Sequence, residues 1–185
     1  MKLHDKIVLV TGGSRGIGKS ISKLFVDEGA QVIITSKNIT KLEQTAKEIN
    51  CSFFIDADIK SEKDVKNAIN KIIEKFGRID ILINNAGILP EQKKLDQINE
   101  NDWNEVLDVD LTGQFRFTKA VIPHMKKNGG SIINMSSDAG LKAFENFYAD
   151  AYVASKAALI MLTKSWALEY ASDNIRVNCI CASVV

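Results

Sequence analysis

Short apolar runs alternate with longer amphipathic segments along this chain. The runs are rich in Ile and Val, and they are apolar at consecutive positions rather than at every second one. Such runs are typical of strands that are buried on both faces of a parallel sheet. They predict strands at Lys6–Val10, Gln31–Thr35, Ser52–Ile55, Ile79–Ile83, Ser131–Met135 and Ile175–Ile180.

Between the runs, apolar residues recur with the period of a helix. In Glu62–Phe76 they fall on one face, while Lys and Glu occupy the other. The same period predicts further helices at Ile17–Glu28, Lys41–Ile49, Asp102–Lys127 and Tyr152–Ala171. Pro123 falls late in the segment Asp102–Lys127, so we expect it to kink or loosen that helix.

Strands that alternate with helices of this length indicate repeated βαβ units. Because crossovers between parallel strands are right-handed, the favoured fold is a doubly wound parallel sheet with helices on both faces. We expect the Rossmann-like α/β strand order 3-2-1-4-5-6. The sequence shows no internal repeat, linker or low-complexity segment, so it predicts one domain over residues 1–185.

Composition narrows the classes of function. The 185 residues are 45% hydrophobic and 25% charged, which is a globular balance, and a net charge of +1 gives no footprint for nucleic acid or an anionic membrane. The longest apolar run, Ala157–Leu162, is too short to span a bilayer. The N-terminus lacks the apolar stretch of a signal peptide, so we expect a cytoplasmic protein. Three Cys without a C-x-x-C pair and two His predict neither a disulfide framework nor a metal site.

A glycine-rich segment, Thr11-Gly12-Gly13-Ser14-Arg15-Gly16-Ile17-Gly18, joins the first predicted strand to a helix. Glycines allow the backbone to approach a pyrophosphate, whose charge the helix N-terminus stabilises. The spacing G-x-x-x-G-x-G differs from the commoner fingerprint G-x-G-x-x-G. A turn without a ligand is the alternative, but the position directly after the first strand favours dinucleotide binding.

The choice of cofactor is read at the end of the second strand, where an acidic residue would bind the ribose 2′-hydroxyl of NAD. This chain has Thr35-Ser36-Lys37-Asn38 there, and Arg15 lies in the glycine loop. Two cations suit the 2′-phosphate of NADP, whose charge is about −1.5 to −2. NADP is therefore the expected cofactor, unless Lys37 and Arg15 are simply solvated.

Two further strand ends carry candidate residues. Asp58 follows the third strand and is placed to accept a hydrogen bond from an adenine amino group, although Asp56 competes for this role and Asp58 is also a candidate helix cap before Ser61. Asn84-Asn85-Ala86-Gly87 follows the fourth strand, and its small and amide side chains let a cofactor lie against the backbone.

The fifth strand leads to Ser136-Ser137, and Tyr152 and Lys156 follow at i and i+4, on one face of a helix. For a phenolate to act near neutral pH, the pKa of Tyr must fall by about three units. A neighbouring ammonium and a cationic oxidised nicotinamide both shift it in that direction. A Tyr–Lys pair is common on exposed helices, but together with the glycine loop and the serine it predicts catalysis.

In this order, TGGSRGIG, Asp58, NNAG, the serine and YVASK resemble the motifs of the classical short-chain dehydrogenase/reductase family over essentially the whole chain. Within that family the chain looks most like 3-oxoacyl-acyl-carrier-protein reductases and related sugar or steroid-type dehydrogenases. The resemblance implies NADP-dependent carbonyl reduction or alcohol oxidation on a small-molecule substrate, with a 3-oxoacyl thioester as one candidate.

The resemblance also implies roles for individual residues. Tyr152 would be the general acid/base, Lys156 would hold the nicotinamide ribose and lower the pKa of Tyr152, and Ser137 rather than Ser136 would bind the substrate oxygen. The implied cofactor-binding residues are Gly12, Ser14, Arg15, Gly16, Ile17, Gly18, Lys37, Asp58, Ile59, Asn85, Ala86, Gly87, Tyr152 and Lys156.

Two departures from the family pattern stand out. Asp110 occupies the place of a catalytic Asn, and its carboxylate is expected to pair with Lys156 and partly cancel the pull of that cation on Tyr152. The family's Pro-Gly turn, substrate-covering segment and last strand are replaced by Ala182-Ser183-Val184-Val185, which predicts an incomplete pocket or a fragment. Both departures keep open an alternative: a catalytically impaired dinucleotide-binding protein with a regulatory or interaction role.

Two surfaces complete the expectations. The helices Asp102–Lys127 and Tyr152–Ala171 carry surplus apolar residues, and the family pairs them across a two-fold axis, so a homodimer or homotetramer is expected. The surplus residues are Phe115, Phe117, Leu159, Leu162 and Trp166. The aromatic stretch Phe144–Tyr148 is either an apolar wall of the substrate site or a loop that packs on the surface.

Overall fold

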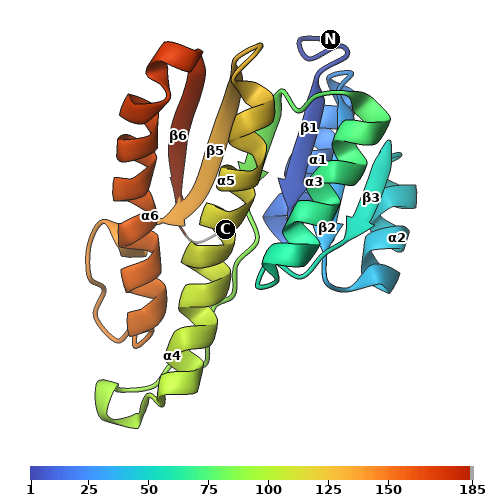
Figure 1. The fold of residues 1–185 in the computed structure, drawn as a ribbon. Coiled ribbons are helices and arrows are strands. Elements are labelled where there is room, and N and C mark those ends of the chain that lie inside the picture. Colours follow the sequence, from blue (N-terminus) through green and yellow to red (C-terminus); the bar gives the residue numbers. More distant parts are fainter. Residues whose placement is uncertain (184–185) are drawn as a thin grey trace.

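The computed structural model describes residues 1–183 and contains one sheet of six parallel strands in the order β3-β2-β1-β4-β5-β6 (Figure 1). The strands are β1 (Ile7–Thr11), β2 (Gln31–Ser36), β3 (Phe53–Asp56), β4 (Ile81–Asn84), β5 (Gly130–Ser137) and β6 (Ile175–Ala182). The predicted strand order is confirmed. Val184 and Val185, the last two residues of the C-terminal departure, lie outside the described residues.

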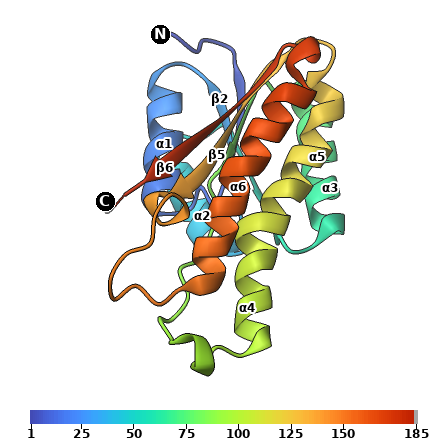
Figure 2. The same ribbon diagram turned by 90° about the vertical axis from the view of Figure 1, so that its left-hand side faces the viewer.

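Helices cover both faces of the sheet (Figure 2). They are α1 (Gly16–Asp27), α2 (Ile39–Glu48), α3 (Glu62–Phe76), α4 (Glu100–Leu107), α5 (Gly113–Met125) and α6 (Asp150–Glu169). Short helical turns occur at η1 (Leu95–Gln97), η2 (Asp108–Thr112), η3 (Asp138–Gly140) and η4 (Ala171–Asp173). In the described residues, no helix combines the length and the apolar character that crossing a membrane requires.

Side chains of successive strand residues point to opposite faces, so each strand contributes to two cores. Along β1, Ile7 and Leu9 pack with α3, α5 and α6, whereas Val8 and Val10 pack with α1 and α2. Because both faces are covered, every β1 position is buried and apolar except its last, Thr11. This double burial explains why the strands have continuous apolar runs rather than an alternating pattern.

The segment Asp102–Lys127 differs from its prediction as one helix. It consists of α4, a π-helical turn at η2, and α5. Pro123 lies inside α5, which continues to Met125, so the irregularity is at η2 and not at the proline. Pro123 removes one hydrogen bond of the helix, but only two residues of α5 follow it, whereas the extra residue of a π turn shifts every side chain that follows it.

The prediction of surplus apolar surface is partly wrong. Phe117, Leu159 and Trp166 are buried in the core between the sheet and its helices. Leu162 is partly buried against that core, and Phe115 is 44% exposed. The large apolar residues of α6 that are exposed are instead Met161 and Leu168, at 62% and 83% exposure.

Candidate active site

The carboxyl ends of β1, β2 and β4 and the turn after β3 surround a cavity of about 370 Å³, which we call the loop cavity. The predicted cofactor residues from the glycine loop and the strand ends all line it. They are Gly12, Ser14, Arg15, Gly16, Ile17, Gly18, Lys37, Asp58, Ile59, Asn85, Ala86 and Gly87. Val109 and Phe117 also line it, although no sequence pattern singles out Val109 and the helical period places Phe117 on surplus apolar surface.

Glycines are required in the loop for two different reasons. A Cβ on Gly18 would stand 2.4 Å from the carbonyl oxygen of Gly12 and from Asn85 Nδ2, so the loop packs on the turn after β4 only without a side chain there. Gly16 has a positive φ of 51° and faces open space. Its helix, α1, has no side-chain cap and no carboxylate in its first turn. Its free N–H groups therefore suit the pyrophosphate of a dinucleotide.

Thr11 joins the ends of β1 and β4, a role that the sequence analysis missed. Its Oγ1 accepts hydrogen bonds from the backbone N–H groups of Asn85 and Ala86, both at 3.0 Å, and donates to the carbonyl of Ile83 at 3.3 Å. Asn85 Nδ2 donates in return to the carbonyl of Thr11 at 3.0 Å. The available signal was a polar residue at the end of a strand that is otherwise apolar.

The end of β2 offers hydroxyls and cations. Ser14 Oγ donates to Ser36 Oγ at 3.2 Å, and Thr45 Oγ1 donates to the carbonyl of Ser14 at 2.8 Å, which fixes this part of the loop. Arg15 and Lys37 are exposed and line the same cavity. The corner is therefore suited to an anionic group such as a 2′-phosphate.

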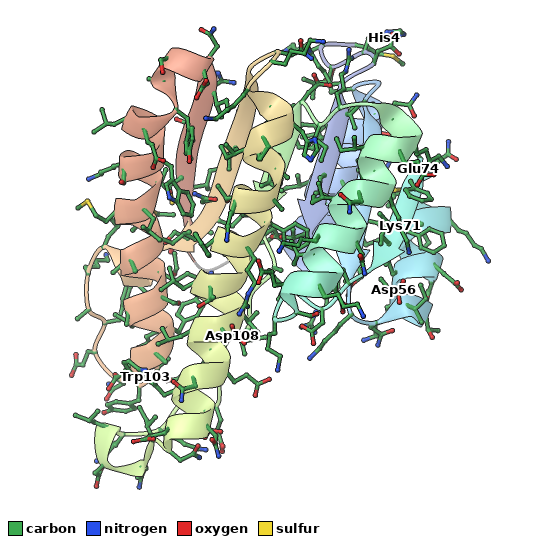
Figure 3. All side chains as sticks on the ribbon, viewed as in Figure 1. His4, Asp56, Lys71, Glu74, Trp103 and Asp108 are labelled. Atoms are coloured by element: carbon green, nitrogen blue, oxygen red, sulfur yellow. The ribbon has the colours of Figure 1, made fainter. Side chains whose placement is uncertain are left out.

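The structure separates the alternatives at the end of β3. Asp58 lines the loop cavity, and its Oδ1 accepts a hydrogen bond from the backbone N–H of Lys60 at 2.9 Å. Ser61, not Asp58, caps α3 by accepting from the N–H of Asp64. Asp56, labelled in Figure 3, is exposed and does not line the cavity.

A second cavity, of about 230 Å³, lies beside the first and is called the tyrosine cavity here. Its lining includes the four catalytic candidates Asp110, Ser137, Tyr152 and Lys156. The two cavities share Ile17, Asn85, Gly87 and Ile88. The topology thus brings residues from η2, β5 and α6 together next to the glycine loop.

Ser136 and Ser137 both line the tyrosine cavity but differ in their hydrogen bonds. Ser136 Oγ donates to the backbone carbonyl of Lys156 at 2.8 Å, so it holds α6 against β5. Ser137 Oγ donates to Asp138 Oδ1 at 3.1 Å and accepts from the N–H of Ala139. Hydrogen bonds from Ser183 and Ser137 lower the pKa of the half-exposed Asp138 carboxyl. Ser137 is thus the serine whose hydroxyl is not tied to α6.

Lys156 and Asp110 form the expected ion pair. Lys156 Nζ lies 3.0 Å from Asp110 Oδ2, donates to the carbonyl of Met135 at 3.2 Å, and lies 5.2 Å from the ring centroid of Tyr152. Asp110 Oδ1 accepts a hydrogen bond from the N–H of Ile88 at 2.8 Å. Burial raises the pKa of the Asp110 carboxyl, and the charge of Lys156 opposes that shift.

Gln114, which no sequence pattern singles out, contacts the same turn as Asp110. It is fully buried one turn after Asp110, and its Nε2 donates to the carbonyl of Ala86. Asp110 accepts a hydrogen bond from the N–H of Ile88. Asp110 and Gln114 therefore bind the backbone of the turn after β4 on both sides of Gly87. A Cβ on Gly87 would stand 3.0 Å from Asp110 Oδ2 and 3.4 Å from Lys156 Nζ, so only glycine leaves the pair undisturbed.

The aromatic stretch before α6 packs against Tyr152. The ring of Phe147 meets that of Tyr152 edge to face, and Phe144 meets Phe147 in the same way. Neither phenylalanine is among the residues that line the tyrosine cavity. The loop is tied to the segment before α4 by a hydrogen bond from the N–H of Lys93 to the carbonyl of Tyr148, at 2.9 Å.

Known proteins resemble this chain along its length. L-fucose dehydrogenase from Bos taurus is 37% identical over 175 residues, which cover 95% of this chain and 64% of that protein. The 3-oxoacyl-[acyl-carrier-protein] reductase FabG from Thermotoga maritima is 40% identical over 187 aligned positions, which cover 97% of this chain and 74% of that protein. The chain thus spans slightly less than two thirds of the L-fucose dehydrogenase.

Solved structures and a family model agree with these relatives. A short chain dehydrogenase from Mycobacterium smegmatis superposes with a TM-score of 0.94 at 30% identity, covering 100% of this chain and 79% of that one. The model of the short chain dehydrogenase family matches residues 6–185. With the sheet order and the glycine loop described above, this match shows that the chain belongs to the classical short-chain dehydrogenase/reductase family.

Proposed function

We propose that this chain is one NADP-binding domain that interconverts a secondary alcohol and its ketone. The reaction is alcohol plus NADP⁺ giving ketone plus NADPH and a proton. The observation that carries the proposal is that Ser137, Tyr152 and Lys156 line a cavity that shares four residues with the glycine-loop cavity. A reacting carbon beside Tyr152 would therefore lie next to a dinucleotide held by the loop.

The residues at the loop cavity fit the cofactor. The glycine loop and the free N–H groups of α1 would hold the pyrophosphate, and Asp58 and Ile59 the adenine. Asn85, Ala86 and Gly87 would support the ribose and the nicotinamide. When bound, NADP supplies the acceptor or donor of the hydride. We favour NADP over NAD because Arg15, Ser36 and Lys37 surround the corner where a 2′-phosphate would lie.

Side chains of the protein would transfer the proton of the substrate hydroxyl. Tyr152 would take the hydroxyl proton during oxidation and return it during reduction, with Lys156 stabilising the phenolate. Lys156 is 5.2 Å from the ring centroid of Tyr152, close enough for its charge to act. Ser137 would donate a hydrogen bond to the substrate oxygen, for which its hydroxyl must turn away from Asp138.

The relatives suggest which class of substrate this chain acts on. Besides L-fucose dehydrogenase and the 3-oxoacyl reductase, they include a 3beta-hydroxysteroid dehydrogenase and a trans-4-hydroxycyclohexanecarboxylate dehydrogenase. We propose a small molecule with a secondary hydroxyl or the matching ketone, and we keep a 3-oxoacyl thioester as a candidate.

One observation favours a second function. Asp110 neutralises part of the charge that Lys156 would direct at Tyr152, which weakens the stabilisation of a phenolate. A dinucleotide-binding protein with little turnover is therefore the alternative.

Titration with NADPH, followed by an assay of NADPH formation or consumption, separates the two functions. The assay panel holds L-fucose, a 3β-hydroxysteroid, 4-hydroxycyclohexanecarboxylate and a 3-oxoacyl thioester. We expect binding and turnover of at least one substrate. Binding without turnover across the panel supports the alternative, and failure to bind NADPH contradicts both functions.

A further inference from the structure

A buried carboxylate lies inside the tyrosine cavity, where it changes the net charge beside the reacting groups. Asp110 is fully buried and the side chain of Lys156 is 5% exposed, so their charges are screened by little water. Within residues 1–183, Asp110 Oδ2 has no hydrogen bond, and its contact with Lys156 Nζ at 3.0 Å is an ion pair. Removing one partner of such a pair leaves the other as an uncompensated buried charge.

The surroundings of this pair leave few other charges to consider. Asp138 is the other carboxylate near the cavity, but it is half exposed and already accepts hydrogen bonds from Ser137 and Ser183. Asp108, on the same π-helical turn as Asp110, pairs with Arg116 at 2.7 Å and does not line the tyrosine cavity. Among the described residues that line this cavity, Asp110 is thus the one carboxylate, and it is fully buried.

We propose that Asp110 is a positioning residue that, through Lys156, makes this site favour the oxidised over the reduced cofactor. The inference rests on the proposed function, in which Lys156 lies at the nicotinamide ribose. The oxidised nicotinamide ring is a cation, whereas the reduced ring is neutral. An unpaired ammonium beside it repels the oxidised form, and the paired carboxylate removes that repulsion.

The expected effect is large enough to measure by binding alone. One unit charge acting over about 10 Å, at an effective dielectric constant of about 20, already changes an equilibrium by more than about tenfold, and a shorter distance gives a larger change. Both nucleotides share the adenosine, 2′-phosphate and pyrophosphate, so a loss confined to those contacts would weaken them equally. Only a change of charge near the nicotinamide separates the two forms.

The experiment uses Asp110→Asn, which keeps the shape of the side chain and removes its charge. Dissociation constants of NADP⁺, NADPH and 2′,5′-ADP are measured by calorimetry for the wild type and the variant. We expect NADP⁺ binding to weaken by at least about tenfold relative to NADPH binding, with 2′,5′-ADP binding unchanged because this probe lacks the nicotinamide. Asp110→Glu, which restores the charge, should return the ratio toward the wild-type value.

Asp27→Asn is the matched control. Asp27 is an exposed carboxylate on α1 that pairs with Lys23 at 2.9 Å, so the same change of charge is made away from the tyrosine cavity. Its ratio of NADP⁺ to NADPH affinity should equal that of the wild type.

The outcomes separate the inference from the proposed function. An unchanged ratio in a folded Asp110→Asn variant, or an equal loss for all three nucleotides, overturns the inference but leaves the proposed function standing. A wild-type protein that binds none of the nucleotides overturns the proposed function. If Asp110→Asn fails to fold, Asp110→Ser makes the same test, because it also removes the charge.

Discussion

The ring of Phe147 packs edge to face on the ring of Tyr152, with the two centroids 6.3 Å apart. Within residues 1–183, the Tyr152 hydroxyl takes part in no hydrogen bond, so ring contacts and the helix position this side chain. The ring of Phe144 packs in turn on that of Phe147, with the two centroids 6.5 Å apart. The hydroxyl is therefore free for a substrate, and its removal should leave the ring in place.

The first prediction concerns that hydroxyl. Tyr152→Phe should keep the fold and NADPH binding but lower turnover by at least about 10²–10⁴-fold, the range typical of general acid–base catalysis. Tyr170→Phe, at the far end of α6, is the control and should leave turnover unchanged. Steady-state kinetics and thermal melting test both variants. Full activity in Tyr152→Phe would refute the proposed role.

The second prediction concerns the choice between NADPH and NADH. Lys37→Asp replaces a cation at the end of β2 with a carboxylate, which repels a 2′-phosphate and can accept a hydrogen bond from a ribose 2′-hydroxyl. The preference for NADPH should narrow or reverse in a fluorescence titration. Lys71→Asp on the exposed face of α3 should not change it (Figure 3). Equal affinities for both cofactors in the wild type would contradict the prediction.

The third prediction concerns the packing of the glycine loop. Gly18→Ala places a methyl group 2.4 Å from the Gly12 carbonyl oxygen, which is backbone and cannot move aside cheaply. We expect a loss of about 1–3 kcal/mol in the free energy of unfolding, as for other overpacked sites, together with weaker NADPH binding. Urea unfolding measures the first effect. Ser20→Ala, at an exposed position of the same helix, should be nearly neutral, and a Gly18→Ala variant as stable as the wild type would be inconsistent with this packing.

The fourth prediction concerns pH and stability. Burial raises the pKa of the Asp110 carboxyl above its ordinary value of 3.8, so the folded protein binds that proton more tightly than the unfolded chain does. The resulting contribution to the free energy of unfolding is complete below pH 3.8 and is lost as the pH rises through the raised pKa. Asp110→Asn lacks this titration. The wild type should therefore lose stability relative to the variant as the pH rises across that window, and the opposite trend in urea unfolding would show the sign to be wrong.

The fifth prediction concerns assembly. Phe115 on α5 and Met161 and Leu168 on α6 are exposed apolar side chains, and soluble homo-oligomers are usually symmetric and closed. We expect at least a dimer through these helices in sedimentation velocity at micromolar concentration. Leu168→Lys should weaken the assembly because it buries a charge at the interface. A wild-type protein that sediments only as a monomer would count against the prediction.

The sequence by itself determined the sheet and the order of its motifs. Strands buried on both faces must be apolar at consecutive positions, so Ile7 to Val10 and the other runs could be recognised without knowing their neighbours. The glycine loop could be recognised because it directly follows such a run. Tyr152 and Lys156 could be placed on one helical face because i and i+4 always lie together in a helix. These features depend on local geometry alone.

Tertiary structure decided what depends on a partner from elsewhere in the chain. A helical period reveals an apolar face but not what covers it, so Phe117, Leu159 and Trp166 were predicted as surplus and are core. The role of Thr11 depends on the turn after β4, and that of Gln114 on the carbonyl of Ala86. The family resemblance favours Ser137 over Ser136, and packing supplies the physical reason, because the hydroxyl of Ser136 donates to the backbone carbonyl of Lys156 in α6. The extra residue of the π turn at Asp108–Thr112 leaves no mark on the hydrophobic period, yet it lies where Asp110 meets Lys156.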